Sequence, residues 1–210
     1  MKRLFDIISS ASGLLLLSPI FLIVTLLIKL DSAGPVLYRQ MRVGMNFRRL
    51  WIIKFRTMEN QADKKGLQIT AGGDKRVTRL GRLLRKGKID ELPQLFNVLR
   101  GEMSLVGPRP EVEKYVELYK KDYEEILKIR PGITDISSVI FSNEERVLQN
   151  QSDPEWYYKH ILLPEKIKLA REYMRRASFF YDMKVIFRTL YKVFYQVIAK
   201  LLPAASSPGR

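Results

Sequence analysis

The longest apolar stretch of the chain lies near its N-terminus and is interrupted close to its middle. An almost uncharged run extends from Ile7 to Ile28, and a helix needs about 20 apolar residues to cross a bilayer. Pro19 stands within this run, where it bends or breaks a helix. Basic residues flank both ends and favour the cytoplasmic side. The pattern predicts a re-entrant helix–break–helix that turns at Ser18 and Pro19, with a kinked spanning helix as the alternative.

Alternating apolar and polar positions in residues 34–58 predict a small antiparallel β-hairpin. Two strand-like runs flank a turn at 44–46. Period-two alternation places Trp51 on one face with the other large apolar residues, and Lys54 and Arg56 on the opposite face. These two cations are either ordinary solvated side chains or a basic face turned toward the carboxylates at positions 90 and 91.

Helical periodicity dominates the rest of the chain. Residues 77–86 predict a short helix with arginines on its polar face, and residues 153–173 a longer helix. In residues 184–200, polar side chains recur every four positions beside apolar ones, and all of them except Gln196 are basic, which is typical of an amphipathic helix in a membrane interface. A helix packed on a soluble core has the same periodicity. The predicted fold class is α+β, mainly helical, with the re-entrant segment, a small antiparallel sheet and amphipathic interfacial helices.

Two adjacent carboxylates, Asp90 and Glu91, open a short apolar helix inside a strongly basic stretch. Asp90 is suited to cap the start of the helix. Glu91 is suited to the first turn, where the helix dipole favours negative charge. Nearby cations are expected to keep both carboxylates ionised. An ionised carboxylate can act as a covalent nucleophile or bind a metal ion, although an acidic pair at a helix start most often serves only the helix. Spacings of three and four predict one buried helix face: Leu92, Leu95, Phe96 and Leu99.

The overall charge indicates an anionic partner. Lys and Arg number 37 against 22 Asp and Glu, a net charge of +15 at pH 7, which favours nucleic acid, an anionic membrane surface or phosphorylated substrates. The chain has no Cys and one His, so catalysis would fall to carboxylates, lysines and arginines. Arg109 lies between two prolines and is suited to rigid, bidentate phosphate contact, or to a plain structural turn. A membrane-tethered module that binds nucleic acid or anionic lipid without catalysis is the alternative.

An ordered set of motifs resembles the bacterial sugar transferases, specifically the monotopic phosphoglycosyl transferases that start glycan assembly on a polyprenol carrier. Together the motifs cover most of residues 1–135, and the ordered set is far more specific than any one of them. Besides Ser18 and Pro19, the matching segments are KFRTM at 54–58, RLGRLLR at 79–85, DELPQL at 90–95, NVLRGEMS at 97–104, VGPRP at 106–110 and RPGIT at 130–134.

The resemblance implies a reaction and its participants. A sugar 1-phosphate would pass from a UDP-sugar to polyprenol (undecaprenyl) phosphate, with release of UMP and use of Mg²⁺. By the match, Asp90 is the nucleophile and a Mg²⁺ ligand, and Glu91 assists, for example as a base. In direct transfer, the two carboxylates would only hold Mg²⁺. The phosphate-binding positions implied are Lys54, Arg56, Arg85 and Arg109.

The resemblance also implies a location and a division of the chain. Residues 1–31 would form the re-entrant segment, 32–203 a catalytic domain on the cytoplasmic face of the bacterial inner membrane, and 204–210 a disordered tail. Membrane lipids are expected partners, nucleic acid is not, and a homodimer is left open. One departure concerns an arginine expected near Ser142, which is absent unless Arg146 replaces it.

Overall fold

The N-terminal apolar stretch folds as two helices that meet at an angle. The computed structural model describes residues 1–60, 62, 69 and 72–201, so the predicted tail at 204–210 lies outside them. Helices α1 (Lys2–Leu16) and α2 (Ser18–Asp31) are separated by one residue and bent by 59°. Pro19 lies in the first turn of α2, where its missing N–H is not needed. The predicted break is therefore confirmed.

In the described part of the chain, no single helix is both long and apolar enough to cross a bilayer, whereas the bent pair α1–α2 meets the length and composition together. Along α2 one face is buried at Val24 and Ile28, and the other is exposed at Leu22 and Leu26. The buried face packs against the second strand and the third helix, so the pair is half embedded in the protein.

The predicted β-hairpin is also confirmed. Strands β1 (Leu37–Val43) and β2 (Arg49–Phe55) pair antiparallel, and a single 3₁₀ turn, η1 (Met45–Phe47), joins them. The expected alternation fails at Trp51, which is 54% exposed, while Ile52 and Ile53 are both buried. Strand β2 is covered on two sides, because α2 packs on Phe55 and α4 packs beside Ile52.

The acidic pair lies on a helical segment that follows the hairpin. Helix α3 (Arg79–Lys86) is capped by the Thr78 hydroxyl, which accepts from the Gly81 N–H at 2.9 Å. The 3₁₀ helix η3 (Ile89–Gln94) follows and runs directly into α4 (Leu95–Arg100). The change of helix type alters the phase of the side chains, so Phe96 is 41% exposed and Val98 is fully buried instead. The predicted buried face is wrong at Phe96.

A second sheet was not predicted. Strands β3 (Ser104–Val106) and β4 (Gly132–Thr134) pair in parallel, with Ser104 opposite Gly132. Between them lie α5 (Glu113–Leu118) and α6 (Lys120–Ile126). Each strand has only three residues, which is too short for an alternation signal.

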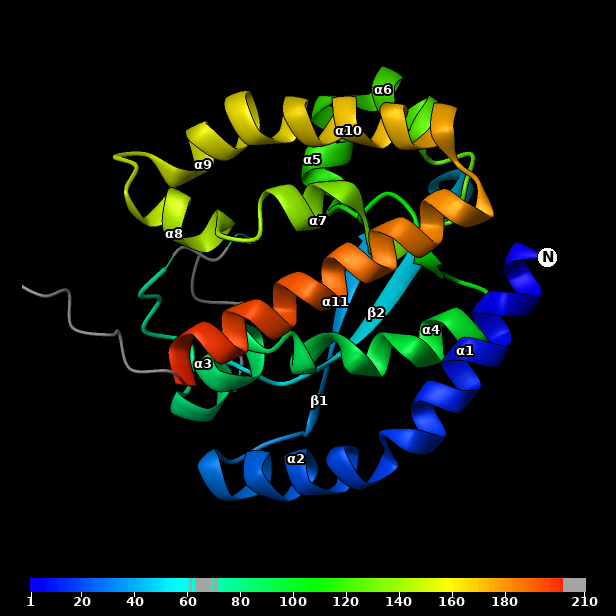
Figure 1. The fold of residues 1–210 in the computed structure, drawn as a ribbon. Helices are drawn as coiled ribbons and strands as arrows, with labels where there is room; N and C mark the ends of the chain where they lie inside the picture. Colours follow the sequence, from blue (N-terminus) through cyan, green and yellow to red (C-terminus); the bar gives the residue numbers. More distant parts are fainter. Residues whose placement is uncertain (61, 63–68, 70–71, 202–210) are drawn as a thin grey trace, which may run out of the picture.

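From Ile136 onward, the regular elements of the described residues are all helical. They are α7 (Ile136–Ile140), α8 (Glu144–Gln149), α9 (Pro154–Tyr157), the π-turn η4 (Tyr158–Leu162), α10 (Leu163–Arg176) and α11 (Phe179–Leu201). In Figure 1, α5, α6, α9 and α10 form an upper layer, α11 crosses the middle, and α1 runs beside α4 below. On α11 the side chains of Phe180, Phe187, Tyr191 and Phe194 are exposed.

Candidate active site

Asp90 and Glu91 are buried at the start of η3, with 7% and 8% of their surfaces exposed. The residue that precedes the helix is Lys88, in a left-handed conformation with φ of 55°. The prediction that Asp90 caps the helix is therefore wrong, because the left-handed turn places Asp90 inside the first turn. The Oδ1 atom of Asp90 is buried, and no described residue donates a hydrogen bond to it. A buried carboxylate oxygen without a partner is costly in a purely structural role.

Glu91 is held by two of the predicted cations. Lys54 Nζ, from β2, lies 3.1 Å from Glu91 Oε1. Arg109 donates to both carboxylate oxygens, through Nη1 to Oε2 at 3.2 Å and through Nη2 to Oε1. Such a bidentate pair has a fixed orientation. The fold thus brings Lys54, Glu91 and Arg109 together from three separate segments.

The loop that carries Arg109 is held tightly by the second sheet. The Gly107 N–H donates to Thr134 O at 3.1 Å, and the Gly132 N–H donates to Pro108 O at 3.0 Å. A Cβ atom on Gly107 would lie 2.5 Å from a backbone oxygen of residue 130. Only glycine allows this close crossing, and the crossing fixes the backbone on which Arg109 stands.

Arg85 and Arg56 occupy different surroundings. Arg85 Nε donates to the Thr57 hydroxyl at 2.9 Å, and its Nη1 pairs with Glu145 Oε1 at 3.0 Å. Arg56 is buried and lies apart from the pair around Glu91. Its guanidinium donates to the carbonyl oxygens of Ser32 and Ala33, at 2.6 and 3.0 Å, just beyond the end of α2.

The two carboxylates differ in charge environment. Burial raises the pKa of Asp90, and the neighbouring charge of Glu91 raises it further. Burial would also raise the pKa of Glu91, but the charges of Arg109 and Lys54 outweigh it and hold that pKa well below its ordinary value. Nearby cations favour the ionised form of both carboxylates, as expected. They outweigh burial at Glu91, whereas at Asp90 burial and the charge of Glu91 outweigh them. Burial likewise lowers the pKa of Lys54, although Glu91 opposes the shift.

Asn97 is a structural contributor that sequence reasoning missed. It is fully buried, accepts from the Ile53 N–H at 3.1 Å, and donates to Trp51 O at 2.8 Å and to Glu102 Oε2 at 2.6 Å. These bonds fix α4 to β2, and thereby the acidic pair to Lys54. The signal in the sequence is a single amide inside an otherwise apolar helical run.

The acidic pair offers few oxygen ligands to a Mg²⁺ ion. In the described ranges, no cluster of three or more His, Asp or Glu side chains is placed to hold a metal ion. Mg²⁺ usually binds one or two carboxylates and completes its shell with water and substrate phosphates. The unpartnered Oδ1 of Asp90 fits that role, so the residues are compatible with Mg²⁺ delivered together with a phosphorylated substrate.

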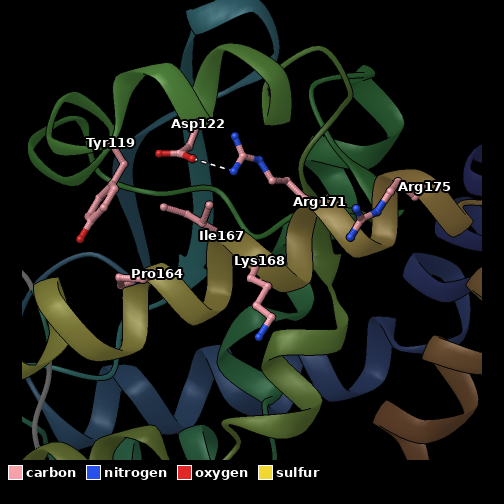
Figure 2. A pocket seen from close by; sticks show the side chains of 7 residues that line it. All are labelled: Tyr119, Asp122, Pro164, Ile167, Lys168, Arg171 and Arg175. Carbon is pink, nitrogen blue, oxygen red and sulfur yellow. Dashed lines mark ion pairs between the residues drawn. The ribbon is translucent and has the colours of Figure 1, made fainter.

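A pocket away from the acidic pair lies between α6 and α10. It has a volume of about 230 Å³ and shares no residue with the site. Figure 2 shows its lining, with Arg171 paired to Asp122 across the groove. A smaller void of about 20 Å³ lies beside Arg109 and Asp135, with room for about one water molecule.

The arginine that the family resemblance implies near Ser142 is absent from the sequence. The nearest arginine after it, Arg146, is exposed on α8.

Comparison with known proteins places the chain among sugar transferases. The chain is 42% identical over 196 residues to an undecaprenyl-phosphate glucose phosphotransferase of Komagataeibacter xylinus, covering 90% of this chain and 35% of that protein. It is 38% identical to a UDP-glucose:undecaprenyl-phosphate glucose-1-phosphate transferase of Caulobacter vibrioides, covering 90% of this chain and 68% of the relative. It is 39% identical to the exopolysaccharide production protein PSS of Rhizobium leguminosarum bv. phaseoli, covering 90% and 93%.

The chain thus spans about a third of the first relative's length and nearly all of the third's. The sequence model of one family, described as bacterial sugar transferase, matches residues 1–196. Because that match covers nearly the whole chain, the protein belongs to the bacterial sugar transferase family.

Proposed function

We propose that the protein transfers a sugar 1-phosphate from a UDP-sugar to a polyprenol phosphate such as undecaprenyl phosphate, with release of UMP, as the first step of polysaccharide or glycoconjugate synthesis. Relatives that are 38% and 42% identical are named for transfer of this kind. The observation that carries the proposal is the asymmetric pair. Asp90 has a buried oxygen without a partner, and the adjacent Glu91 is saturated by two cations.

In the first step we assign Asp90 as the nucleophile. One of its carboxylate oxygens attacks the β-phosphorus of the donor, and the bond between that phosphorus and the bridging oxygen breaks. UMP leaves with the bonding electron pair, and an acyl phosphate joins Asp90 to the sugar phosphate. The Oδ1 atom of Asp90, to which no described residue donates a hydrogen bond, is well suited to attack. Positive charge from Lys54, Arg85 and Arg109 stabilises the negative charge that develops on the phosphoryl oxygens in the transition state.

In the second step the phosphate of the lipid acceptor attacks the same phosphorus. The bond to Asp90 breaks, a diphosphate forms, and the carboxylate is restored. A phosphate monoester has a second pKa of about 6, so at neutral pH its attacking oxygen needs little help from a base. Glu91 therefore acts by positioning Lys54 and Arg109, and its lowered pKa makes it a poor base.

Mg²⁺ and the membrane complete the proposal. When bound, Mg²⁺ would offset the charge of the donor's diphosphate, with Asp90 as its protein ligand. The exposed apolar residues of α1 and α2 and the exposed aromatic residues of α11 would lie in the cytoplasmic face of the bacterial membrane, among lipid headgroups and chains. This placement would bring the site to the level where a membrane-held acceptor presents its phosphate.

The test uses a panel of UDP-sugars, Mg²⁺ and no acceptor. Intact-mass analysis of the wild type should then find one sugar phosphate added to the protein, on the peptide that contains Asp90, and none on Asp90→Asn. A wild type that forms lipid-linked product once acceptor is added, yet never carries the adduct, would favour direct transfer, with both carboxylates as metal ligands only.

A further inference from the structure

The first turn of α1 is bonded to parts of the chain that are distant in sequence. Lys2 Nζ donates to Val106 O at 3.0 Å, at the end of β3, and to the Tyr173 hydroxyl at 2.9 Å, near the end of α10. It also forms an ion pair with Asp182, in the first turn of α11. The Asp182 side chain is only 7% exposed and also accepts from Tyr173 at 2.8 Å. Lys2 thus neutralises a buried carboxylate.

The next two charged residues continue the same pattern. Arg3 donates to the carbonyl oxygens of Val98 and Leu99, at 2.6 and 3.0 Å, and so caps the C-terminal end of α4. Asp6 is 3% exposed. It accepts from two groups of β3, the Ser104 hydroxyl at 2.8 Å and a backbone N–H at 3.2 Å. From the sequence, Lys2 and Arg3 are expected as membrane flanks, whereas in the fold they make internal contacts.

These contacts connect the membrane segment to the site. Helix α4 is continuous with η3, which holds Asp90, and β3 leads into the loop of Arg109. Farther along α1, Gly13 lies against Leu95, the first residue of α4, since a Cβ atom on Gly13 would be 3.3 Å from Leu95 Cδ1. If α1 rotated about its first turn, the rest of the helix would therefore move relative to Asp90 and Arg109.

We propose that Lys2, Asp182 and Tyr173, here called the anchor, are positioning residues that set the tilt of α1–α2. The tilt in turn sets the depth at which Asp90 meets the phosphate of a membrane-held acceptor. Helix α1 has 15 residues, so it is about 22 Å long, and a tilt of about 10° moves its far end by about 4 Å. Misplacement by about 1 Å can lower a rate by about a hundredfold. A water-soluble donor reaches the site from solution, so its binding does not depend on the depth of Asp90 in the membrane.

The inference rests on the proposed function for the nature of the acceptor. The test variants are Lys2→Met, which leaves Asp182 buried without its cation, and Lys2→Met/Asp182→Asn, which leaves no unpaired buried charge. Lys2→Arg keeps the charge. Lys121→Met is the matched control, because Lys121 is exposed on α6 and the described residues include no hydrogen-bond or ion-pair partner for it.

In lipid vesicles, the KM for polyprenol phosphate should rise about fivefold or more in both Lys2→Met proteins, while the KM for the UDP-sugar stays unchanged. In Lys2→Arg the KM for polyprenol phosphate should return close to the wild-type value, and Lys121→Met should behave as wild type. Equal KM changes for both substrates in the double variant, or no change in either, would overturn the proposal.

A second readout does not depend on catalysis. The chain has no cysteine, so Leu16→Cys places a single label at the exposed tip of α1, where Leu16 is 76% exposed. Quenching by lipids brominated at different depths should report a changed depth in Lys2→Met/Asp182→Asn. An unchanged depth would overturn the inference. If the wild type transfers no sugar phosphate, the proposed function fails, and the depth measurement still decides the role of the anchor.

Discussion

Neutralising the two adjacent carboxylates should change the stability of the protein in opposite directions. The pKa of Asp90 is raised in the folded protein by burial and by Glu91. The stability that this group contributes is therefore present below the ordinary pKa of an aspartate and is lost as pH rises through the raised value. Glu91 has a lowered pKa, mainly because Arg109 and Lys54 outweigh its burial. Its contribution is present above the ordinary pKa of a glutamate and is lost as pH falls through the lowered value.

The magnitudes follow from the contacts. At neutral pH, Asp90→Asn removes a buried charge whose Oδ1 has no partner, and because the new amide is also incompletely bonded, we expect a gain of about 1 kcal/mol. Glu91→Gln leaves Lys54 and Arg109 without their anion, and breaking a buried pair typically costs about 3–5 kcal/mol. In a protein of this size 1 kcal/mol shifts Tm by about 2–4 °C. Asp90→Asn should thus raise Tm by about that amount, and Glu91→Gln should lower it by about 6 °C or more.

The assay is thermal unfolding in detergent, with chelator present and one scan rate throughout. Asp153→Asn serves as the control for the chemical change, because the exposed Asp153 side chain caps α9 by accepting from the Trp156 N–H at 2.9 Å and asparagine caps a helix about as well as aspartate. Its Tm should stay close to wild type. A clear loss of stability in Asp90→Asn, similar to that in Glu91→Gln, would refute the reasoning and make Asp90 an ordinary structural carboxylate.

Three further predictions concern the site and its support. Gly107→Ala should lower the kcat of the folded fraction strongly, because its Cβ would lie 2.5 Å from a backbone oxygen and displace Arg109; steady-state kinetics normalised to folded protein checks this, and unchanged kcat would contradict it. Arg56→Ala should lower Tm while the turnover of the folded fraction persists, because Arg56 bonds to Ser32 and the end of α2; turnover per folded molecule that falls with intact Tm would instead favour phosphate binding. Without acceptor, formation of the Asp90 adduct should fall on acidification at a higher pH than an ordinary aspartate would give, since protonated Asp90 cannot attack; the pH dependence of the rate of adduct formation measures this, and an acid limb at the ordinary aspartate pKa would contradict it.

Local signals were enough to predict the elements that follow simple patterns. The break beside Pro19 follows from the chemistry of proline, and the β-hairpin follows from period-two alternation. The acidic pair stood out because Asp90 and Glu91 interrupt a basic stretch.

Features that depend on contacts between distant segments were not predicted. The parallel pair β3–β4 consists of two three-residue strands joined through two helices. The difference between Asp90 and Glu91 arises from which carboxylate faces Lys54 and Arg109, which spacing along the chain does not determine. Lys2 has the sequence signature of a membrane flank, and only the fold brings it to Asp182.

The central claim is that phosphate moves together with the sugar, and the identity of the released nucleotide tests it most directly. The measurement separates UMP from UDP after incubation of a UDP-sugar, polyprenol phosphate and Mg²⁺ with wild type or Asp90→Asn. We predict UMP from the wild type, in equal amount to the lipid-linked product, and neither product from the variant. Release of UDP in place of UMP, or equal UMP release by Asp90→Asn, would contradict the account.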